Sequence, residues 1–348
     1  MPSLLVIGTE IGVFDPQSPA RERILAYARQ FGETHIIVLC RGAYATERVG
    51  NATLHPTNSW TRALYGFDAL RIARRLPRPD IVSVQDPYDS GMLGLLVARI
   101  RAARLHVQVH TDVFAASFRQ HSLLNAVRAI VARSVFSHAD GIRVVAEHIK
   151  LSIEKRLTPK RPIAVLPIYV DTEHFRHAGA IADPRFARFA TKLLWVGRFE
   201  AEKDPLRALD AFASAAPSGA CLIYLGEGAL IESLRARAHE LSVHDRVFFE
   251  GHQDPAPYYA LADLVLVTSE YEGYSRVVVE ALAAGRPVLS TDVGIAREAG
   301  ARIAEGDFSE ALRQWFQGGA RSGELHGYPY RDIDDYVRQY CDDILRLV

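Results

Sequence analysis

Short apolar segments alternate with longer amphipathic ones along the whole chain. In the first half the apolar segments cover residues 4–8, 35–40, 80–85, 105–110, 141–145 and 163–167, with helical patterns such as 20–31 and 91–105 between them. In the second half they cover residues 192–197, 221–226, 246–251, 264–269 and 287–291, with helical patterns at 205–215, 229–241, 275–284 and 306–317. Apolar strands without strict polar alternation, separated by helices, are typical of parallel sheets covered on both faces. The pattern therefore predicts an α/β protein with two doubly wound domains.

The two domains are predicted to meet near residues 167–190, where prolines, glycines and aspartates interrupt the periodicity. We expect an N-terminal domain over residues 1–172, a C-terminal domain over 173–330 and a last amphipathic helix over 331–348. A length of 348 residues also favours two domains over one. Ligands of such folds bind at the carboxyl ends of the parallel strands, so the loops at those ends are the places to search for chemistry.

The composition is that of a folded protein, and its charge is unevenly distributed. Hydrophobic residues make up 49% and charged residues 24% of the chain, which excludes a disordered or collagen-like protein. The net charge is zero, but residues 1–172 carry 22 Lys and Arg against 14 Asp and Glu, whereas residues 173–348 carry 19 against 27. A basic surface attracts phosphates, anionic lipids or nucleic acid. The alternative is that the two oppositely charged halves simply attract each other.

The sequence favours a cytoplasmic protein. Its first 15 residues lack the basic start of a secretion signal, and the apolar run there stops at Gly8. All apolar stretches are far shorter than the roughly 20 residues that a membrane helix needs. The three cysteines, Cys40, Cys221 and Cys341, are too few and too scattered for a disulfide framework or a zinc finger.

The segment 192–212 places two cations next to the start of a predicted helix. Its strand ends at Gly197 and is followed by Arg198, a short loop and Lys203. Asp204 suits a helix N-cap and Pro205 the first helical position. Because a helix N-terminus favours anions, two cations beside it suit a diphosphate. The alternative is an ordinary surface Arg and Lys.

The segment 269–290 carries two glutamates in an otherwise apolar context. Glu280 lies within a run of apolar and small residues, where an unpaired carboxylate is costly and hydroxyl groups of a ligand would satisfy it. The alternative for Glu280 is a core ion pair with an Arg. Glu272 precedes Gly273 in the loop before the predicted helix, so both glutamates are expected to line one pocket near that helix N-terminus.

These two segments resemble the retaining GT-B glycosyltransferases of family 4, also called glycosyl transferases group 1. Gly197, Arg198 and Lys203 match the family's strand-Gly-Arg-loop-Lys motif, and Glu272 and Glu280 match its Glu-x7-Glu motif. The segments 280–288 and 291–298 also look like that family. The resemblance is strong over about 192–298 and weaker but collinear over the front half, where 167–175 is similar to the interdomain segment.

The resemblance implies a GT-B fold, with two Rossmann-like domains facing across a cleft and the C-terminal helix packing back on the N-terminal domain. It further implies that Arg198 and Lys203 hold the donor's diphosphate, that Glu280 binds the ribose and that Glu272 contacts the transferred sugar. Backbone groups from Gly273 to Ser275, including Tyr274, would face sugar or phosphate. Such enzymes normally need no metal and no cofactor besides the nucleotide-sugar substrate. Of these residues, Arg198, Lys203 and Glu272 are the catalytic candidates.

Further candidates come from other strand ends. His110, at the end of a front-half strand, resembles the family's catalytic His that touches the donor sugar; the alternative is a His that caps the following turn. Asp112 would orient His110 or bind acceptor, and Asp86 is a second acceptor-side candidate. Gly12 would approach the donor through its backbone, although the family's usual Gly-Gly pair is replaced here by Gly8 and Gly12. Gly226 would contact the donor or simply form a tight turn.

The sequence therefore predicts a retaining hexosyltransferase that moves a sugar from a nucleotide-diphosphate sugar, such as a UDP- or GDP-sugar, to a hydroxyl acceptor. The acceptor would be a glycan, a glycolipid or a lipid-linked sugar, in cell-surface polysaccharide or glycolipid synthesis. Arg-rich segments at 99–104 and 150–161 suggest an anionic or lipid-linked acceptor at a membrane face, with the protein bound peripherally to the anionic inner face of the cell membrane; an ordinary solvated surface is the alternative. No nucleic-acid partner is expected. A sugar-nucleotide epimerase and a non-catalytic nucleotide-sugar-binding protein remain the alternative functions.

Overall fold

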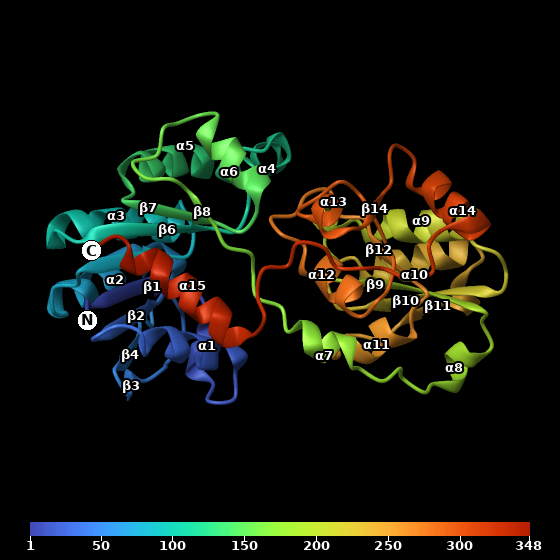
Figure 1. The fold of residues 1–348 in the computed structure, drawn as a ribbon, viewed down its shortest axis with the longest axis horizontal. Coiled ribbons are helices and arrows are strands. Elements are labelled where there is room, and N and C mark those ends of the chain that lie inside the picture. The colour runs from blue at the N-terminus through green and yellow to red at the C-terminus, as the bar shows by residue number, and fades with distance from the viewer. The chain divides into compact units, whose positions relative to one another are not determined.

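A computed structural model describes residues 1–348, apart from the side chain of His121. The chain forms two compact units: the first consists of Met1–Pro167 together with Tyr330–Val348, and the second of Ile168–Pro329. The division after Pro167 lies five residues before the predicted boundary at 172. The C-terminal segment returns to the first unit, as expected, and its helix packs among the elements of that unit (Figure 1).

The first unit is built on an eight-stranded sheet in the order β3-β4-β2-β1-β5-β6-β7-β8. All neighbouring strands are parallel except β3, which pairs antiparallel with β4 at one edge. The strands are β1 (Leu4–Gly8), β2 (Thr34–Val38), β3 (Glu47–Val49), β4 (Ala52–Pro56), β5 (Ile81–Val84), β6 (Arg104–Val109), β7 (Gly141–Val144) and β8 (Ala164–Val165).

Helices cover both faces of this sheet. On one face α2 packs against α3 and α3 against α5, with α6 beyond them; on the other α1 packs against α15 (Figure 1). The helices are α1 (Pro19–Ala28), α2 (Tyr65–Arg75), α3 (Asp89–Arg101), α4 (Ala116–His121), α5 (Leu123–His138), α6 (Glu147–Glu154) and α15 (Ile333–Leu345), with short 3-10 helices η1 (Ile11–Phe14) and η2 (Arg62–Leu64).

A buried polar network fixes α15 on the first unit. The guanidinium of Arg143 on β7 donates to Gln108 Oε1 (3.1 Å), and Gln108 Nε2 donates to the hydroxyl of Tyr340 on α15 (2.7 Å). His106 Nε2 on β6 lies 3.1 Å from Asp343 Oδ2, also on α15. Since buried polar groups are costly unless paired, these contacts explain why the C-terminal helix returns to this sheet.

The second unit is built on a six-stranded, all-parallel sheet in the order β11-β10-β9-β12-β13-β14. Its strands are β9 (Thr191–Val196), β10 (Ala220–Leu225), β11 (Val247–Phe249), β12 (Leu264–Val267), β13 (Val288–Ser290) and β14 (Arg302–Ile303). Its helices are α7 (Thr172–Arg176), α8 (Pro184–Ala187), α9 (Pro205–Ala215), α10 (Ile231–Glu240), α11 (Ala256–Leu261), α12 (Arg276–Ala283), α13 (Ala296–Ala299) and α14 (Phe308–Gly318), with 3-10 helices η3 (Ala201–Lys203) and η4 (His244–Arg246).

The predicted parallel strands and their helices are confirmed in both units, and α9 has the predicted bounds. The sequence pattern missed the short strands β3, β4 and β14. A Gly50-Asn51 turn joins β3 to β4, and Gly50 has a φ of 62°, which is typical of hairpin turns. That dipeptide was the signal for the hairpin, but strands of three and five residues with polar members show no apolar run.

Candidate functional site

The residues of the two sequence motifs come together at the carboxyl edge of the sheet in the second unit. Arg198 and Lys203 follow β9, whereas Glu272 follows β12, and β9 and β12 are hydrogen-bonded neighbours. Parallel neighbours open their following loops on the same side of a sheet, which is where ligands of doubly wound folds bind.

Lys203 and Glu272 form a close ion pair. Lys203 Nζ lies 2.5 Å from Glu272 Oε1, and that oxygen also accepts a hydrogen bond from Ser269 Oγ at 2.8 Å. The hydroxyl of Thr268 donates to the carbonyls of Lys203 (3.1 Å) and Asp204 (2.8 Å), which holds the turn after η3 against the end of β12. The cation and the carboxylate are therefore placed by two different loops that are fixed to each other.

Arg198 provides a second and more accessible cation. Its side chain is 71% exposed, and its guanidinium lies 2.7 Å from Glu202 Oε1, four residues later. An exposed ion pair of this kind contributes little to stability, so the guanidinium is free to change partner. Both cations thus carry a carboxylate partner that an anionic ligand would have to displace.

The helix that follows Lys203 starts as predicted. Asp204 is the N-cap of α9, and its side chain accepts a hydrogen bond from the backbone N–H of Arg207 at 3.2 Å. Pro205 occupies the first helical position. Asp204 adopts a φ of 44°, an uncommon conformation for a residue with a side chain, and the hydrogen bonds from Thr268 hold it there.

The N-terminus of α12 lies at the same edge and is left uncapped by its own side chain. Ser275 precedes the helix with a φ of 69°, and its Oγ is buried without a hydrogen-bond partner among the described residues. The preceding Tyr274 is buried, and its carbonyl accepts a hydrogen bond from the N–H of Ile295 at 3.1 Å. The neighbouring Gly294 has no room for a Cβ, which would lie 2.6 Å from the Tyr274 carbonyl oxygen. The segment 291–295 therefore holds the Tyr274–Ser275 backbone in place.

Glu280 on α12 is 5% exposed, and both of its oxygens have partners within the protein. Oε1 lies 3.1 Å from the guanidinium of Arg276, and Oε2 accepts a hydrogen bond from the hydroxyl of Tyr259 at 3.0 Å. Burial raises the pKa of Glu280, while Arg276 and Tyr259 act in the opposite direction. The ion pair with an Arg, which was the alternative for Glu280, is therefore present; a ligand hydroxyl would add to these contacts or replace that of the exposed Arg276.

The backbone conformation and the close packing at position 226 require a glycine. Its φ is 142°, and a Cβ there would lie 1.9 Å from the carbonyl oxygen of Gly197. Glycine is thus required because the loop after β10 passes directly over the loop after β9. This close approach holds the backbone next to Arg198 in position.

A pocket of about 310 Å³ opens beside these two loops. Its lining consists of Val196, Gly197, Arg198, Leu225, Gly226, Glu227, His252, Gln253 and Pro255. The sequence analysis singled out Gly197, Arg198 and Gly226 among these residues but not Glu227, His252, Gln253 or Pro255. His252 and Gln253 lie just after β11, the next strand of the sheet. Their signal in the sequence was the position of Gly-His-Gln-Asp-Pro directly after an apolar strand, but none of these residue types marks a known chemistry by itself.

The candidates in the first unit are partly engaged in local structure. The carboxylate of Asp86 accepts hydrogen bonds from the N–H of Tyr88 (2.9 Å) and from the hydroxyl of Ser90 (2.6 Å), so it fixes the loop before α3. Asp112 Oδ1 accepts from the N–H of Phe114 and from the hydroxyl of Ser152, both at 2.9 Å. Both aspartates therefore have structural roles at the carboxyl edge of this sheet.

His110 and Gly12 lie at that edge as well. His110 directly follows β6 and is exposed, and within the described residues it has no hydrogen bond to Asp112. The expected orientation of His110 by Asp112 is therefore not present. Gly12 lies in η1, and its N–H donates to Glu10 Oε1 at 3.3 Å.

The described part of the chain has neither a metal-binding cluster nor a membrane-spanning helix. It contains no group of three or more His, Cys, Asp or Glu side chains arranged to hold a metal ion. None of its helices is both long and apolar enough to cross a membrane.

Family comparisons fit this architecture. Residues 190–317, within the second unit, match the family "Glycosyl transferases group 1", and residues 20–168 match the "Glycosyl transferase 4-like domain". The chain belongs to the group 1 glycosyltransferases. The match in the second unit contains the whole Arg198–Glu280 site, and the match in the first unit contains Asp86, His110 and Asp112 but not Gly12.

Several curated proteins are similar to parts of this group 1 glycosyltransferase. A GDP-mannose-dependent alpha-(1-6)-phosphatidylinositol monomannoside mannosyltransferase of Mycobacterium tuberculosis is 29% identical over 198 residues, 51% of this chain and 50% of the relative. An alpha-monoglucosyldiacylglycerol synthase of Streptococcus pneumoniae is 26% identical over 253 residues, 66% of this chain and 55% of the relative. The matched region thus spans about half the length of these relatives.

Solved structures show the same fold. An Anabaena protein, HepE, in complex with UDP and glucose superposes with a TM-score of 0.70 at 14% identity, over 100% of this chain and 97% of the other. Sucrose-phosphate synthase from Thermosynechococcus elongatus superposes with a TM-score of 0.71 at 16% identity, over 99% and 95% of the two chains. The fold of this group 1 glycosyltransferase is GT-B, with two parallel-sheet α/β domains.

Proposed function

We propose that this chain transfers a hexosyl group, with retention of configuration, from a nucleoside-diphosphate sugar to a hydroxyl group of a glycan, glycolipid or lipid-linked acceptor. The observation that carries the proposal is the grouping of Arg198, Lys203 and Glu272 beside the uncapped N-terminus of α12. Two cations and free backbone N–H groups suit a diphosphate. The names of the relatives support transfer to lipid-based acceptors over the epimerase alternative.

In this proposal Arg198 and Lys203 bind the donor's diphosphate and stabilise the charge that develops on it as the sugar leaves. Glu272, which already holds Lys203, contacts the transferred sugar. The acceptor hydroxyl attacks from the face on which the diphosphate departs, and the departing phosphate oxygen takes the hydroxyl proton. Positioning and charge stabilisation then supply most of the rate enhancement.

The nucleoside would lie toward the pocket that is lined by the loops following β9, β10 and β11. Glu280 would accept hydrogen bonds from the ribose hydroxyls, because it is a buried carboxylate at the same helix as the diphosphate site. The base would then contact His252 and Gln253 at the far side of the pocket. HepE and its complex with UDP support this use of the fold.

The acceptor would bind at the first unit, near His110 and Asp86, with the protein at the cytoplasmic face of a membrane. All three cysteines are buried and unpaired, which fits a reducing compartment. A nucleic-acid partner and a metal cofactor are not part of the proposal.

The test is binding of UDP, GDP, ADP and CMP to the purified full chain, measured by thermal shift and calorimetry. One nucleoside diphosphate should stabilise the protein, and Lys203→Ala should abolish that shift. The matched control is Lys192→Ala, because Lys192 lies near the amino end of β9, at the other end of this strand from Arg198. Absence of any nucleotide shift in the wild type would contradict the proposed donor site and favour a non-catalytic role.

A further inference from the structure

Large exposed apolar side chains are confined to one of the two units. Among the described residues, the second unit (168–329) exposes none, whereas the first unit exposes all those of the chain. Both units are doubly wound sheets of similar size, so the fold itself does not require such exposure. Contiguous exposed apolar surface on a soluble unit marks a surface that something covers.

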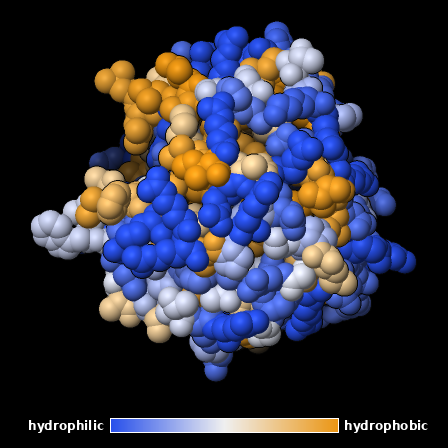
Figure 2. Space-filling view, turned by 90° about the vertical axis from the view of Figure 1, so that its left-hand side faces the viewer, coloured by the Kyte–Doolittle hydropathy of each residue, from blue (hydrophilic) through white to orange (hydrophobic). Residues whose placement is uncertain are grey.

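Six of these side chains form two adjacent stripes, here called the α3–α5 face. The α3 stripe is spaced by four residues and the α5 stripe by four and three, which places each on one side of its helix. The residues are Met92, Leu96 and Ile100 on α3 and Leu123, Val127 and Ile130 on α5. Leu123 is 89% and Ile130 73% exposed. Since α3 packs along α5, the stripes share one outer surface. Figure 2 shows apolar groups in the upper part of the view, at the height of α5 in Figure 1.

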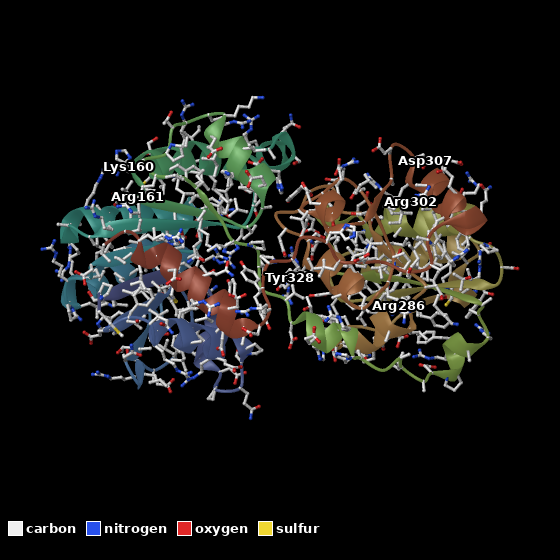
Figure 3. The ribbon with its side chains drawn as sticks, viewed as in Figure 1. Lys160, Arg161, Arg286, Arg302, Asp307 and Tyr328 are labelled. Atoms are coloured by element: carbon white, nitrogen blue, oxygen red, sulfur yellow. The ribbon has the colours of Figure 1, made fainter. Side chains whose placement is uncertain are left out.

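The surroundings of the α3–α5 face are basic. The helix α5 contains no Asp or Glu, and the only one on α3, Asp89, is paired with Arg128 at 2.5 Å. Arg99, Arg119 and Arg133 are exposed and have no ion-pair partner within the described residues. At the end of α5, Lys160 donates to the carbonyl of His138 at 2.7 Å and pairs with Asp140 at 3.3 Å, so its charge is compensated (Figure 3).

We propose that the α3–α5 face docks on an anionic lipid bilayer, with the two apolar stripes in the interface and Arg99, Arg119 and Arg133 at the headgroups. Both helices bury apolar side chains on their inner side and expose further ones on their outer side. An exposed apolar surface flanked by cations is suited to the interface of an anionic membrane. Apolar contact and attraction to anionic headgroups act together there. The inference rests on the proposed function, because it names the surface that would bring the site to a lipid-based acceptor.

A second copy of the chain is a poorer occupant for this face. A two-fold dimer would bring the same patch of both subunits together. The arginines of one face would then approach those of the other, and α3 and α5 offer no free carboxylate to pair with them. An anionic bilayer satisfies the same cations without repulsion.

The position of the stripes also fits an acceptor that lies in the membrane. The helix α3 begins just after β5, and α4 and α5 follow the end of β6. Met92 and Leu123, which start the two stripes, therefore lie toward the carboxyl edge of the first sheet, where His110 and Asp86 are found. A lipid-linked acceptor could reach that edge while its chains stay in the bilayer.

The test is sedimentation of the full chain with vesicles of phosphatidylcholine alone and of phosphatidylcholine mixed with phosphatidylglycerol, without donor or acceptor. We expect binding to the anionic vesicles, weakened by salt. Val127→Ser/Ile130→Ser and, separately, Arg99→Gln/Arg133→Gln should each lower the partition coefficient about tenfold. The matched control is Ile333→Ser/Val348→Ser, which removes exposed apolar side chains outside the face and should bind as the wild type does.

Nucleotide thermal shifts on the same variants separate this inference from the proposed function. Both face variants should keep the nucleotide response and the unfolding temperature of the wild type, because their side chains are exposed. No preference for anionic vesicles, or unchanged binding by Val127→Ser/Ile130→Ser, would overturn the docking proposal even with an intact donor site. A dimer that Val127→Ser/Ile130→Ser dissociates, seen by light scattering, would overturn it in favour of a second copy.

Discussion

Lys203 Nζ lies 2.5 Å from Glu272 Oε1, although 69 residues separate the two along the chain. The pair forms because β9 and β12 are parallel neighbours, so the loops that follow them meet at one edge of the sheet. Both side chains are largely shielded from solvent, with exposed fractions of 22% and 15%. Glu272 therefore competes with any anion that approaches Lys203, and the affinity of the site for a diphosphate reflects that competition.

This competition predicts opposite effects of one substitution on binding and on transfer. Glu272→Gln should raise the affinity for the cognate nucleoside diphosphate about fivefold, since removing the carboxylate frees Lys203 and ends its repulsion of the phosphates. The same change should slow sugar transfer, because a contact to the transferred sugar is altered. Calorimetry and a transfer assay on one preparation would measure both. If Glu272→Gln binds the diphosphate no more tightly than the wild type, the ion pair does not limit the affinity of the site for the diphosphate.

Arg198→Ala should separate catalysis from stability. Its side chain is 71% exposed and, among the described residues, forms an ion pair with Glu202 alone, so the free energy of unfolding should change by less than about 0.5 kcal/mol. Loss of a donor aimed at the leaving diphosphate should lower the rate of transfer on the order of 10²–10³. The control is Arg302→Ala, an exposed arginine at the start of β14. Wild-type turnover by Arg198→Ala would remove this residue from the diphosphate site.

The sequence predicted the grouping of the motif residues in the second unit better than it predicted the contacts of the aspartates in the first unit. Arg198, Lys203, Glu272 and Glu280 belong to motifs with fixed spacing at strand and helix ends. Because the strands that precede these motifs are parallel neighbours, the loops that carry the motif residues lie close together. Asp86 is a candidate because it follows the end of a strand, but strand ends also need residues that fix the next loop. One sequence does not distinguish these two uses of an aspartate.

Contacts between segments that are distant along the chain could not be predicted from the sequence either. The hydrogen bond from Tyr259 to Glu280 joins α11 to α12, and no sequence feature of either helix predicts this contact. The buried network of Arg143 with Gln108 and α15 is a similar case: a buried Arg on a strand looks like any other charge in the sequence. Return of the C-terminal helix was predicted from resemblance rather than from these residues.

Glu280 should be tested with glutamine rather than alanine. Glu280→Ala leaves the Tyr259 hydroxyl buried without a partner, which should lower the free energy of unfolding by about 1–3 kcal/mol. Glu280→Gln keeps an acceptor for that hydroxyl and should remain close to wild type in chemical denaturation. If Glu280 also binds the ribose, Glu280→Gln should weaken nucleotide binding while the fold persists. Equal nucleotide affinity in Glu280→Gln and wild type would restrict Glu280 to a structural role.

Gly226→Ala should be among the most damaging single substitutions in the second unit. The new Cβ would lie 1.9 Å from the carbonyl of Gly197, and a φ of 142° is unfavourable for any residue with a side chain. We expect a loss of several kcal/mol in unfolding free energy, or insoluble protein. Gly179→Ala is the control, since a Cβ there meets nothing within 4 Å. Similar melting temperatures for both variants would mean that the loops after β9 and β10 separate easily.

Acid should destabilise the first unit through a pair of histidines on β2 and β4. His35 Nδ1 lies 3.0 Å from His55 Nε2, and burial, followed by the charge of His35, lowers the pKa of His55 to about 4. In the unfolded chain His55 takes up a proton near pH 6.5, so between pH 6.5 and 4 the unfolded state binds more protons and stability falls as the pH drops. The loss should approach about 2 kcal/mol. Calorimetric melting from pH 7.5 to 4.5 should show this slope in the wild type and in the exposed control His326→Gln, and a reduced slope in His55→Gln. An unchanged slope in His55→Gln would place the acid sensitivity elsewhere in the unit.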